Sequence, residues 1–210
     1  RGELYNDDPR LGDARLCGTV ASLCGIEAAE YEGNPFKLEQ AVACDLTLHA
    51  WMLSQSGIPV IYSGDEVGQL NDYTYHNDPK KRDDSRYIHR GKFQWELAEF
   101  RREPNSRQGK LFQGLRRLEA IRAGEPCFDG DADVQVEDSG DSRVLALCRR
   151  AGDRELICLF NFSNQFVRAG ADREGAYTEL MYGTHYDSIR SVELWPNGFA
   201  WLLRDGKGEL

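Results

Sequence analysis

Two acidic clusters stand out as residues that could do chemistry. Asp65 and Glu66 directly follow the short apolar run 58–62, and Asp83 and Asp84 come later in the same polar stretch. Neighbours on an extended backbone point to opposite sides, whereas an acid and a base acting on one bond must converge at ~5–10 Å. Asp65 and Glu66 therefore cannot form such a pair. We expect one of them to close the preceding strand by hydrogen bonding and the other to line a pocket.

The second cluster combines carboxylates with guanidinium groups. Asp84 is followed by Arg86, and His89 and Arg90 come just after it. A planar guanidinium beside carboxylates, on a loop rich in aromatic residues, suits a site that grips sugar hydroxyls while a ring packs against the apolar sugar face. A solvated loop of mixed charge is the alternative interpretation, and the sequence leaves both open.

Elements on both sides of the apolar run would position these residues. Asp13 predicts the start of a helix over 13–23, which would contain Arg15. Asn34 and Pro35 predict a buried helix that ends at Gly57. Residues 58–62 lack polar alternation, which is typical of a strand covered on both faces. The carboxyl end of such a strand is where α/β folds place their sites.

The remainder of the chain divides into three parts. Residues 64–102 predict a long, ordered active-site loop, since aromatics are frequent and periodicity is weak. Residues 105–124 predict an amphipathic helix. A boundary follows at 125–131, and a period-two pattern then predicts an antiparallel β domain. Its strands are expected at 134–136, 143–148, 155–160, 178–181, 189–194 and 199–203.

These elements predict an α/β part followed by an all-β part. Because one strand cannot make a parallel sheet, residues 1–125 indicate the carboxyl-terminal portion of a (β/α)8 TIM barrel. Residues 126–210 indicate a small antiparallel β-sandwich or Greek-key domain. The chain begins at Arg1 with a polar stretch that has no element signal. We therefore expect a piece of a longer enzyme.

Composition narrows the range of partners. The net charge of −9, from 35 acidic and 26 basic residues, disfavours a nucleic acid partner. No apolar run has the length of a membrane span, so no membrane partner is expected. Six cysteines show no metal-type spacing, which predicts buried free thiols and no metal site, although their even number keeps disulfides possible. A chain of this size does not require disulfides, which favours a reducing, cytoplasmic location. No phosphate-type glycine loop is present, and no cofactor is expected.

Four motifs identify a family resemblance. They are Gly57-Ile58-Pro59-x-x-Tyr62-x-Gly64-Asp65-Glu66, Gly12-Asp13-x-Arg15-x-x-Gly18-Thr19, the run Val67-Gly68 with Leu70-Asn71-Asp72, and Asp83-Asp84-Ser85-Arg86-x-x-His89-Arg90. With them the chain resembles, over nearly all its length, the carboxyl-terminal part of sucrose-acting, amylosucrase-like enzymes of the α-amylase superfamily (glycoside hydrolase family 13). The first motif is shared across the superfamily, and the other three resemble the sucrose-acting members.

The resemblance implies roles for three residues. Arg86 would help to close the pocket that holds the glucosyl ring by pairing with an aspartate from the amino-terminal part of the barrel, with Asp84 beside it. Arg15 would lie near the donor or acceptor subsites. Tyr87 and Gly91 stand where tryptophan and proline are expected, which leaves a related specificity open.

The resemblance also implies that no catalytic residue lies in this chain. The nucleophile, the acid/base and the transition-state stabiliser of the family come from earlier barrel strands and would precede Arg1. A retaining mechanism with a covalent glucosyl intermediate would then belong to the whole enzyme. The chain alone is expected to be inactive.

Two readings of function stay open. In the first, the chain is the carboxyl-terminal part of an α-glucosyl transferase or hydrolase that binds sucrose or an α-glucan through the full-length barrel. In the second, it is a stand-alone carbohydrate-binding or structural module without catalysis. An incomplete barrel also predicts a dimer formed through its uncovered strand. The sequence does not separate transfer, hydrolysis and phosphorolysis.

Overall fold

The computed structural model describes residues 2–10 and 12–206, which form helices and antiparallel sheets. The backbone packs as two compact units. The first unit is Arg1–Asp45 with Ile61–Gln113, and the second is Leu46–Val60 with Gly114–Leu210. Both units are discontinuous in sequence, and we describe each by itself. The domain limits 1–125 and 126–210 stay a prediction.

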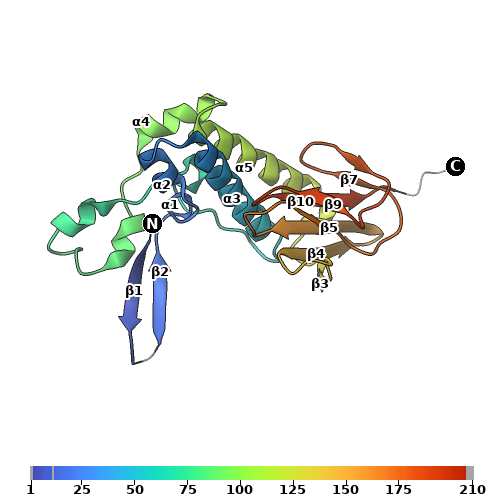
Figure 1. Ribbon diagram of the computed structural model, residues 1–210, viewed down its shortest axis with the longest axis horizontal. Helices are drawn as coiled ribbons and strands as arrows, with labels where there is room; N and C mark the ends of the chain where they lie inside the picture. Colours follow the sequence, from blue (N-terminus) through green and yellow to red (C-terminus); the bar gives the residue numbers. More distant parts are fainter. Residues whose placement is uncertain (1, 11, 207–210) are drawn as a thin grey trace. The chain divides into compact units, whose positions relative to one another are not determined.

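The first unit begins with a hairpin, drawn in blue in Figure 1. Strand β1 (Glu3–Asp8) pairs with strand β2 (Asp13–Cys17) in an antiparallel ladder. The helix predicted over 13–23 is therefore wrong in its first half. Helix α1 (Val20–Leu23) starts only after Thr19, whose hydroxyl accepts a hydrogen bond from the Ser22 amide. Pairing with β1 provides the backbone hydrogen bonds of β2, and this non-local partner outweighs the local helix signal.

Helix α2 (Ile26–Tyr31) leads into α3 (Pro35–Leu53), which confirms the predicted long helix. The Asn34 side chain caps α3, because its Oδ1 accepts a hydrogen bond from the Lys37 amide at 3.1 Å. Gly57, with a φ of +91°, turns the chain beyond the helix end.

The strand predicted at 58–62 is wrong. No described strand pairs with this segment, and Ile58 and Val60 are 92% and 78% exposed. A parallel strand exists only by hydrogen bonding to its neighbours, so an apolar run without such neighbours stays an extended link.

Short helical turns make up the long loop that follows. They are η1 (Asp65–Val67), η2 (Tyr73–Asn77), η3 (Ser85–His89), α4 (Trp95–Ala98) and η4 (Glu99–Arg102). Asp72 and Asp84 cap η2 and η3 with their side chains. Helix α5 (Arg107–Gly124) confirms the last predicted helix, and the Ser106 hydroxyl accepts a hydrogen bond from the Gly109 amide at its start.

The second unit contains the β domain, whose strands are yellow to red in Figure 1. Its six-stranded antiparallel sheet has the order β3-β4-β5-β10-β7-β8, and a two-stranded sheet has the order β6-β9. The period-two pattern predicted most of these strands and missed β6 and β8. Their bounds are β3 (Asp133–Glu137), β4 (Val144–Ala151), β5 (Arg154–Asn161), β6 (Val167–Ala169), β7 (Tyr177–Glu179), β8 (His185–Tyr186), β9 (Val192–Leu194) and β10 (Phe199–Arg204).

Both faces of the larger sheet are buried. On one face, side chains such as Ile157 and Leu159 form a core with Val167 of β6 and Val192 of β9. On the other face, the sheet packs against the end of α3, against α5 and against the 3-10 turn η5 (Pro126–Phe128). Each large apolar side chain buried in this way contributes about 1.5–3 kcal/mol. The β domain therefore depends on helical residues that precede it in the chain.

Arg149 is buried completely on β4. Its guanidinium donates to the carbonyl of Ser54 at 2.7 Å, of Cys127 at 2.5 Å and of Asp129 at 2.9 Å. The carbonyls of Ser54 and Cys127 are buried at these bonds, and the Asp129 carbonyl also accepts a hydrogen bond from the Ala132 amide at 3.2 Å, so one cation joins three acceptors at once.

Candidate carbohydrate-binding site

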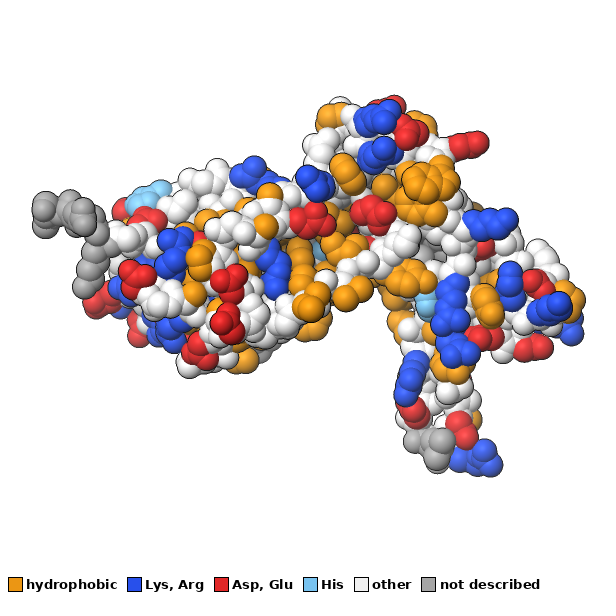
Figure 2. All heavy atoms as spheres, turned by 180° about the vertical axis from the view of Figure 1, so that it is seen from behind, with side chains coloured by type: hydrophobic (Ala, Val, Ile, Leu, Met, Phe, Trp, Pro, Cys, Tyr) orange, Lys and Arg blue, Asp and Glu red, His pale blue; other side chains and the backbone are white. Residues whose placement is uncertain are grey.

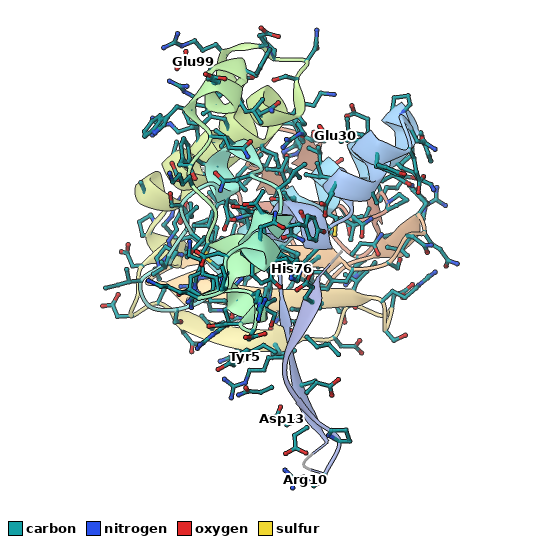
Figure 3. All side chains as sticks on the ribbon, turned by 90° about the vertical axis from the view of Figure 1, so that its left-hand side faces the viewer. Tyr5, Arg10, Asp13, Glu30, His76 and Glu99 are labelled. Atoms are coloured by element: carbon teal, nitrogen blue, oxygen red, sulfur yellow. The ribbon has the colours of Figure 1, made fainter. Side chains whose placement is uncertain are left out.

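The hairpin and η3 bring the predicted site residues together in the first unit. Arg86 of η3 lies over the ring of Tyr5 on β1, with 4.4 Å between its guanidinium carbon and the ring centre. Arg15 of β2 is the register partner of Tyr5. Residues directly opposite in an antiparallel pair project from the same face. Arg15 and Arg86 therefore both neighbour one tyrosine, which Figure 3 labels on the hairpin.

Asp84 holds Arg86 in a fixed orientation. The guanidinium donates to both carboxylate oxygens of Asp84, from Nε and Nη2 at 2.8 Å each, and the Arg86 amide donates to Oδ1 at 3.0 Å. This hydrogen bonding from Arg86 lowers the pKa of Asp84 to about 2 and raises the pKa of Arg86. The pair stays ionised at neutral pH.

The same local fork occurs elsewhere in the chain. Arg10 pairs with Asp8, and Arg143 pairs with Asp141, each two residues apart and each through both carboxylate oxygens. An Asp-x-Arg fork is thus a local turn device rather than a sign of a site. What distinguishes Arg86 is its contact with Tyr5. The aspartate that the resemblance implies as its partner would be a further residue, because Asp84 is the acceptor here.

Contacts with the base of the hairpin hold the loop in place. Ser85 Oγ donates to the carbonyl of Leu4 at 2.8 Å, and Tyr75 Oη donates to the carboxylate of Glu3. The Nε2 atom of His76 lies 3.1 Å from the same carboxylate, and Figure 3 shows His76 beside the start of the hairpin. Ile88 is fully buried in a small core beneath these contacts.

Sequence reasoning missed Glu3 and Tyr5. The segment that contains them is polar and irregular, so no periodicity announced a strand. Tyr5 became relevant only through its pairing with Arg15 and its contact with Arg86, which are both non-local. The only available signal was the pair Leu4-Tyr5 in a stretch that is otherwise polar.

A second aromatic ring is flanked by cations. Lys81 and Arg90 each lie 5.6 Å from the ring centre of Tyr87. Figure 2 shows Lys and Arg side chains among hydrophobic ones at the base of the hairpin. Such cation–π contacts contribute about 0.5–1 kcal/mol each at exposed positions. Rings flanked by donors are a surface on which a sugar can stack and hydrogen-bond.

His89 is a half-buried titratable group in this region. Its ring meets Tyr62 edge to face, with centres 5.9 Å apart. Its Nδ1 atom is buried and has no hydrogen-bond partner among the described residues. Burial and the neighbouring Arg90 lower the pKa of His89. Within the described part of the chain, no group of three His, Cys, Asp or Glu side chains could hold a metal ion.

Glu66 lines a hollow of about 290 Å³ next to this region. One of its carboxylate oxygens also accepts a hydrogen bond from the Gly64 amide at 2.8 Å. The rings of Phe93 and Trp95, 4.6 Å apart, form part of the same wall. Asp65 is buried in η1. The sequence analysis expects one of these two carboxylates to form a hydrogen bond and the other to line a pocket. In the structure, Glu66 does both.

No described helix is both long enough and apolar enough to cross a membrane. The sequence matches no protein-family model. Its fold, however, is similar to several crystal structures. AmyP in complex with maltose has 16% identity and a TM-score of 0.63, and the match covers 80% of this chain and 36% of AmyP.

Two further crystal structures give similar matches. A trehalulose synthase has 18% identity and a TM-score of 0.61, covering 78% of this chain and 38% of its own. The trehalose-6-phosphate hydrolase of Bacillus licheniformis has 18% identity and a TM-score of 0.59, covering 78% and 39%. The chain thus spans well under half the length of these proteins. At these identities the likeness is one of fold, and the chain has the fold of a part of each of these three proteins.

Proposed function

We propose that this chain provides the carboxyl-terminal part of an enzyme that transfers or hydrolyses the glucosyl group of sucrose or a related α-glucoside. In this proposal Arg86, Asp84 and Arg15 bind substrate, and the catalytic carboxylates belong to the barrel strands that precede this part. The proposal joins the sequence motifs around these residues to the fold that the chain shares with α-glucoside-acting proteins.

The observation that carries the proposal is the orientation of Arg86. Asp84 engages Nε and Nη2, and the Tyr5 ring covers one face of the guanidinium. No described residue accepts a hydrogen bond from Nη1. A rigid donor beside an aromatic ring can bind a sugar hydroxyl, or a second carboxylate that closes a pocket, with little loss of side-chain entropy.

In the proposed reaction, this chain binds and orients and does not break the glycosidic bond. A retaining mechanism needs two carboxyl groups about 5–5.5 Å apart across that bond. Asp84 does not suit either role, because Arg86 occupies both of its oxygens and keeps it ionised. It positions Arg86, while Arg15 and the rings of Tyr5 and Tyr87 offer contacts to a glucosyl or acceptor unit.

The exposed run 58–62 favours the barrel reading over a stand-alone module. Ile58 and Val60 are exposed there, in an extended segment that meets no described strand. A run of this kind gains its stability from strands on both sides. An independent sugar-binding module would have no use for it.

The test compares sucrose turnover by the 210-residue chain with turnover by a longer protein that contains it. Glucose and fructose are measured separately, with and without a glucan acceptor. We expect release by the longer protein alone, and an excess of fructose over glucose would identify transfer. Turnover by the isolated chain, or no turnover of any α-glucoside by the longer protein, would overturn the proposal.

A further inference from the structure

A hollow in the first unit is lined by both aromatic rings and polar side chains. It has a volume of about 290 Å³ and includes residues of η1, of α4 and η4, and of α5. Its lining includes Ser63, Glu66, Phe93, Trp95, Arg101 and Phe112, which all belong to the first unit. Neither Arg86 nor the residues that contact it line this hollow, which is therefore a separate feature.

We propose that this hollow is a second carbohydrate-binding site, which takes one end of a neutral α-glucoside such as maltose. The class of ligand rests on the proposed function, whereas binding at the hollow does not require the catalytic groups of that function. Ligand pockets usually measure about 300–1,000 Å³, so a hollow of this size suits a mono- or disaccharide unit rather than a long glucan.

The aromatic part of the lining offers rings on which a sugar can stack. Trp95 is 74% exposed, although a large apolar ring gains free energy when it is covered. The ring of Phe93 lies beside it, with 4.6 Å between the ring centres, and Phe112 adds a third ring to the lining. Flat rings of this kind match the apolar face of a pyranose.

The polar part of the lining has hydrogen-bonding capacity that the described residues leave unused. Glu66 accepts from the Gly64 amide with one oxygen, and no described residue donates to the other. Arg101 Nη1 donates to the carbonyl of Ala98 at 2.9 Å and to the carboxylate of Glu99 at 3.0 Å. No described residue accepts from its Nε or Nη2. Each side chain is thus already oriented, which lowers the entropy cost of binding a ligand.

The charges of these two side chains favour a neutral ligand. The carboxylate of Glu66 repels anions, and the guanidinium of Arg101 repels cations. A sugar hydroxyl can donate to the one and accept from the other. Stacking on aromatic rings, together with hydrogen bonds from an acceptor and a donor, is therefore the recognition that this hollow can provide.

The experiment titrates the folded, nitrogen-15-labelled 210-residue chain with maltose and follows the indole N–H signals by NMR. Trp95 is the one tryptophan of the first unit, because the others lie at positions 51, 195 and 201 of the second. We expect a saturable shift of the Trp95 signal. The Trp195 signal is the internal control, since that ring is 73% exposed and does not line the hollow. Tryptophan-to-phenylalanine substitutions assign the signals.

Two glutamate substitutions test the polar contact. Glu66→Gln removes the charged acceptor and should weaken maltose binding about tenfold. Glu96→Gln is the matched control, because it removes the same charge next to Trp95 in α4 but does not line the hollow, and it should leave the titration unchanged. Wild-type positions of the three other indole signals would show that each variant is folded. Equal weakening by both substitutions would overturn the assignment of Glu66.

The outcomes separate this proposal from the proposed function. Arg86→Ala should leave the Trp95 titration unchanged, and loss of the shift in that variant would overturn a second site. Glycerol has hydroxyls but no ring to stack, so it should cause no saturable shift. No saturable shift at Trp95 with maltose, an equal shift at Trp195, or an equal response to glycerol would overturn the proposal. Lack of turnover by the longer protein would overturn the proposed function alone.

Discussion

Arg86 rests on the face of Tyr5, and Tyr5 stands opposite Arg15 in the hairpin register. One aromatic ring thereby links two arginines that belong to separate sequence motifs. A guanidinium fixed by Asp84 on one side and by a ring on another has little freedom to lose when it binds a substrate.

Arg86→Lys should impair a longer enzyme that contains this chain. Lysine keeps the positive charge but cannot form the fork with Asp84 or stack on Tyr5. Loss of a charged hydrogen bond predicts a decrease in kcat/KM for sucrose of about 10- to 100-fold. Arg143→Lys is the matched control, since it removes the same local fork in the second unit. Equal decreases in both variants would mean that the Arg86 effect is structural.

The Asp84 carboxylate should titrate near pH 2. Its pKa is lowered in the folded chain, so the stabilising pair is complete above the ordinary carboxyl range near pH 4 and is lost as the pH falls toward about 2. Carbon-13 NMR of the side-chain carboxyl measures this midpoint. In Arg86→Ala it should rise toward the ordinary range, while Asp141, which also has a pKa of about 2, stays unchanged. A wild-type midpoint near pH 4 would contradict the pairing.

Gly68→Ala should destabilise the first unit. Gly68 has a φ of +61°, and an added Cβ would lie 2.5 Å from Leu111 Cδ1. Arg107 also donates to the Gly68 carbonyl, so the backbone cannot move away freely. Strain and overpacking together predict a loss of about 2–4 kcal/mol, measured by urea unfolding. Gly12→Ala shares the positive φ but meets no atom within 4 Å, and it should cost about 1–2 kcal/mol.

The exposed apolar link predicts self-association. We expect the 210-residue chain to dimerise or form larger species through residues 58–62, because exposed apolar segments associate in water. The double substitution Ile58→Ser and Val60→Ser should shift the species toward monomer in light scattering across a concentration series. Val136→Ser, at another exposed valine, is the control. A wild-type chain that stays monomeric at high concentration would contradict this prediction.

Arg149→Ala should lower the free energy of unfolding of the β domain. Two buried carbonyls, of Ser54 and Cys127, would lose their donor at once, which predicts a cost of at least about 2 kcal/mol in urea unfolding. Arg168→Ala, which removes an exposed ion pair with Glu193, should cost less than about 1 kcal/mol. Similar costs for the two variants would show that the buried carbonyls find other donors.

Local signals predicted much of this fold. Asn34 and Pro35 marked the start of α3, and period-two patterns marked β4, β5 and β10, because caps and alternation depend only on neighbouring residues. The errors fell where structure depends on a distant partner. Residues 13–17 form a strand because they pair with residues 3–8. Residues 58–62 do not form a strand because no described strand pairs with them.

In the candidate site too, local features could be predicted from the sequence and non-local contacts could not. The Asp84–Arg86 pair lies within one turn, so its two members could be singled out from sequence. The contact between Arg86 and Tyr5 could not, because it joins residues brought together only by folding.

The helical cover of the β domain limits how this module could be exchanged between proteins. One face of its sheet is closed by the end of α3 and by α5, and Arg149 on β4 donates a hydrogen bond to the Ser54 carbonyl just beyond α3. A transplant limited to 126–210 would leave Trp201 and Phe160 facing water. A recombination event that preserves the fold must therefore include the two helical segments together with the sheet. The smallest segment that can be exchanged and still fold is thus larger than the strands alone.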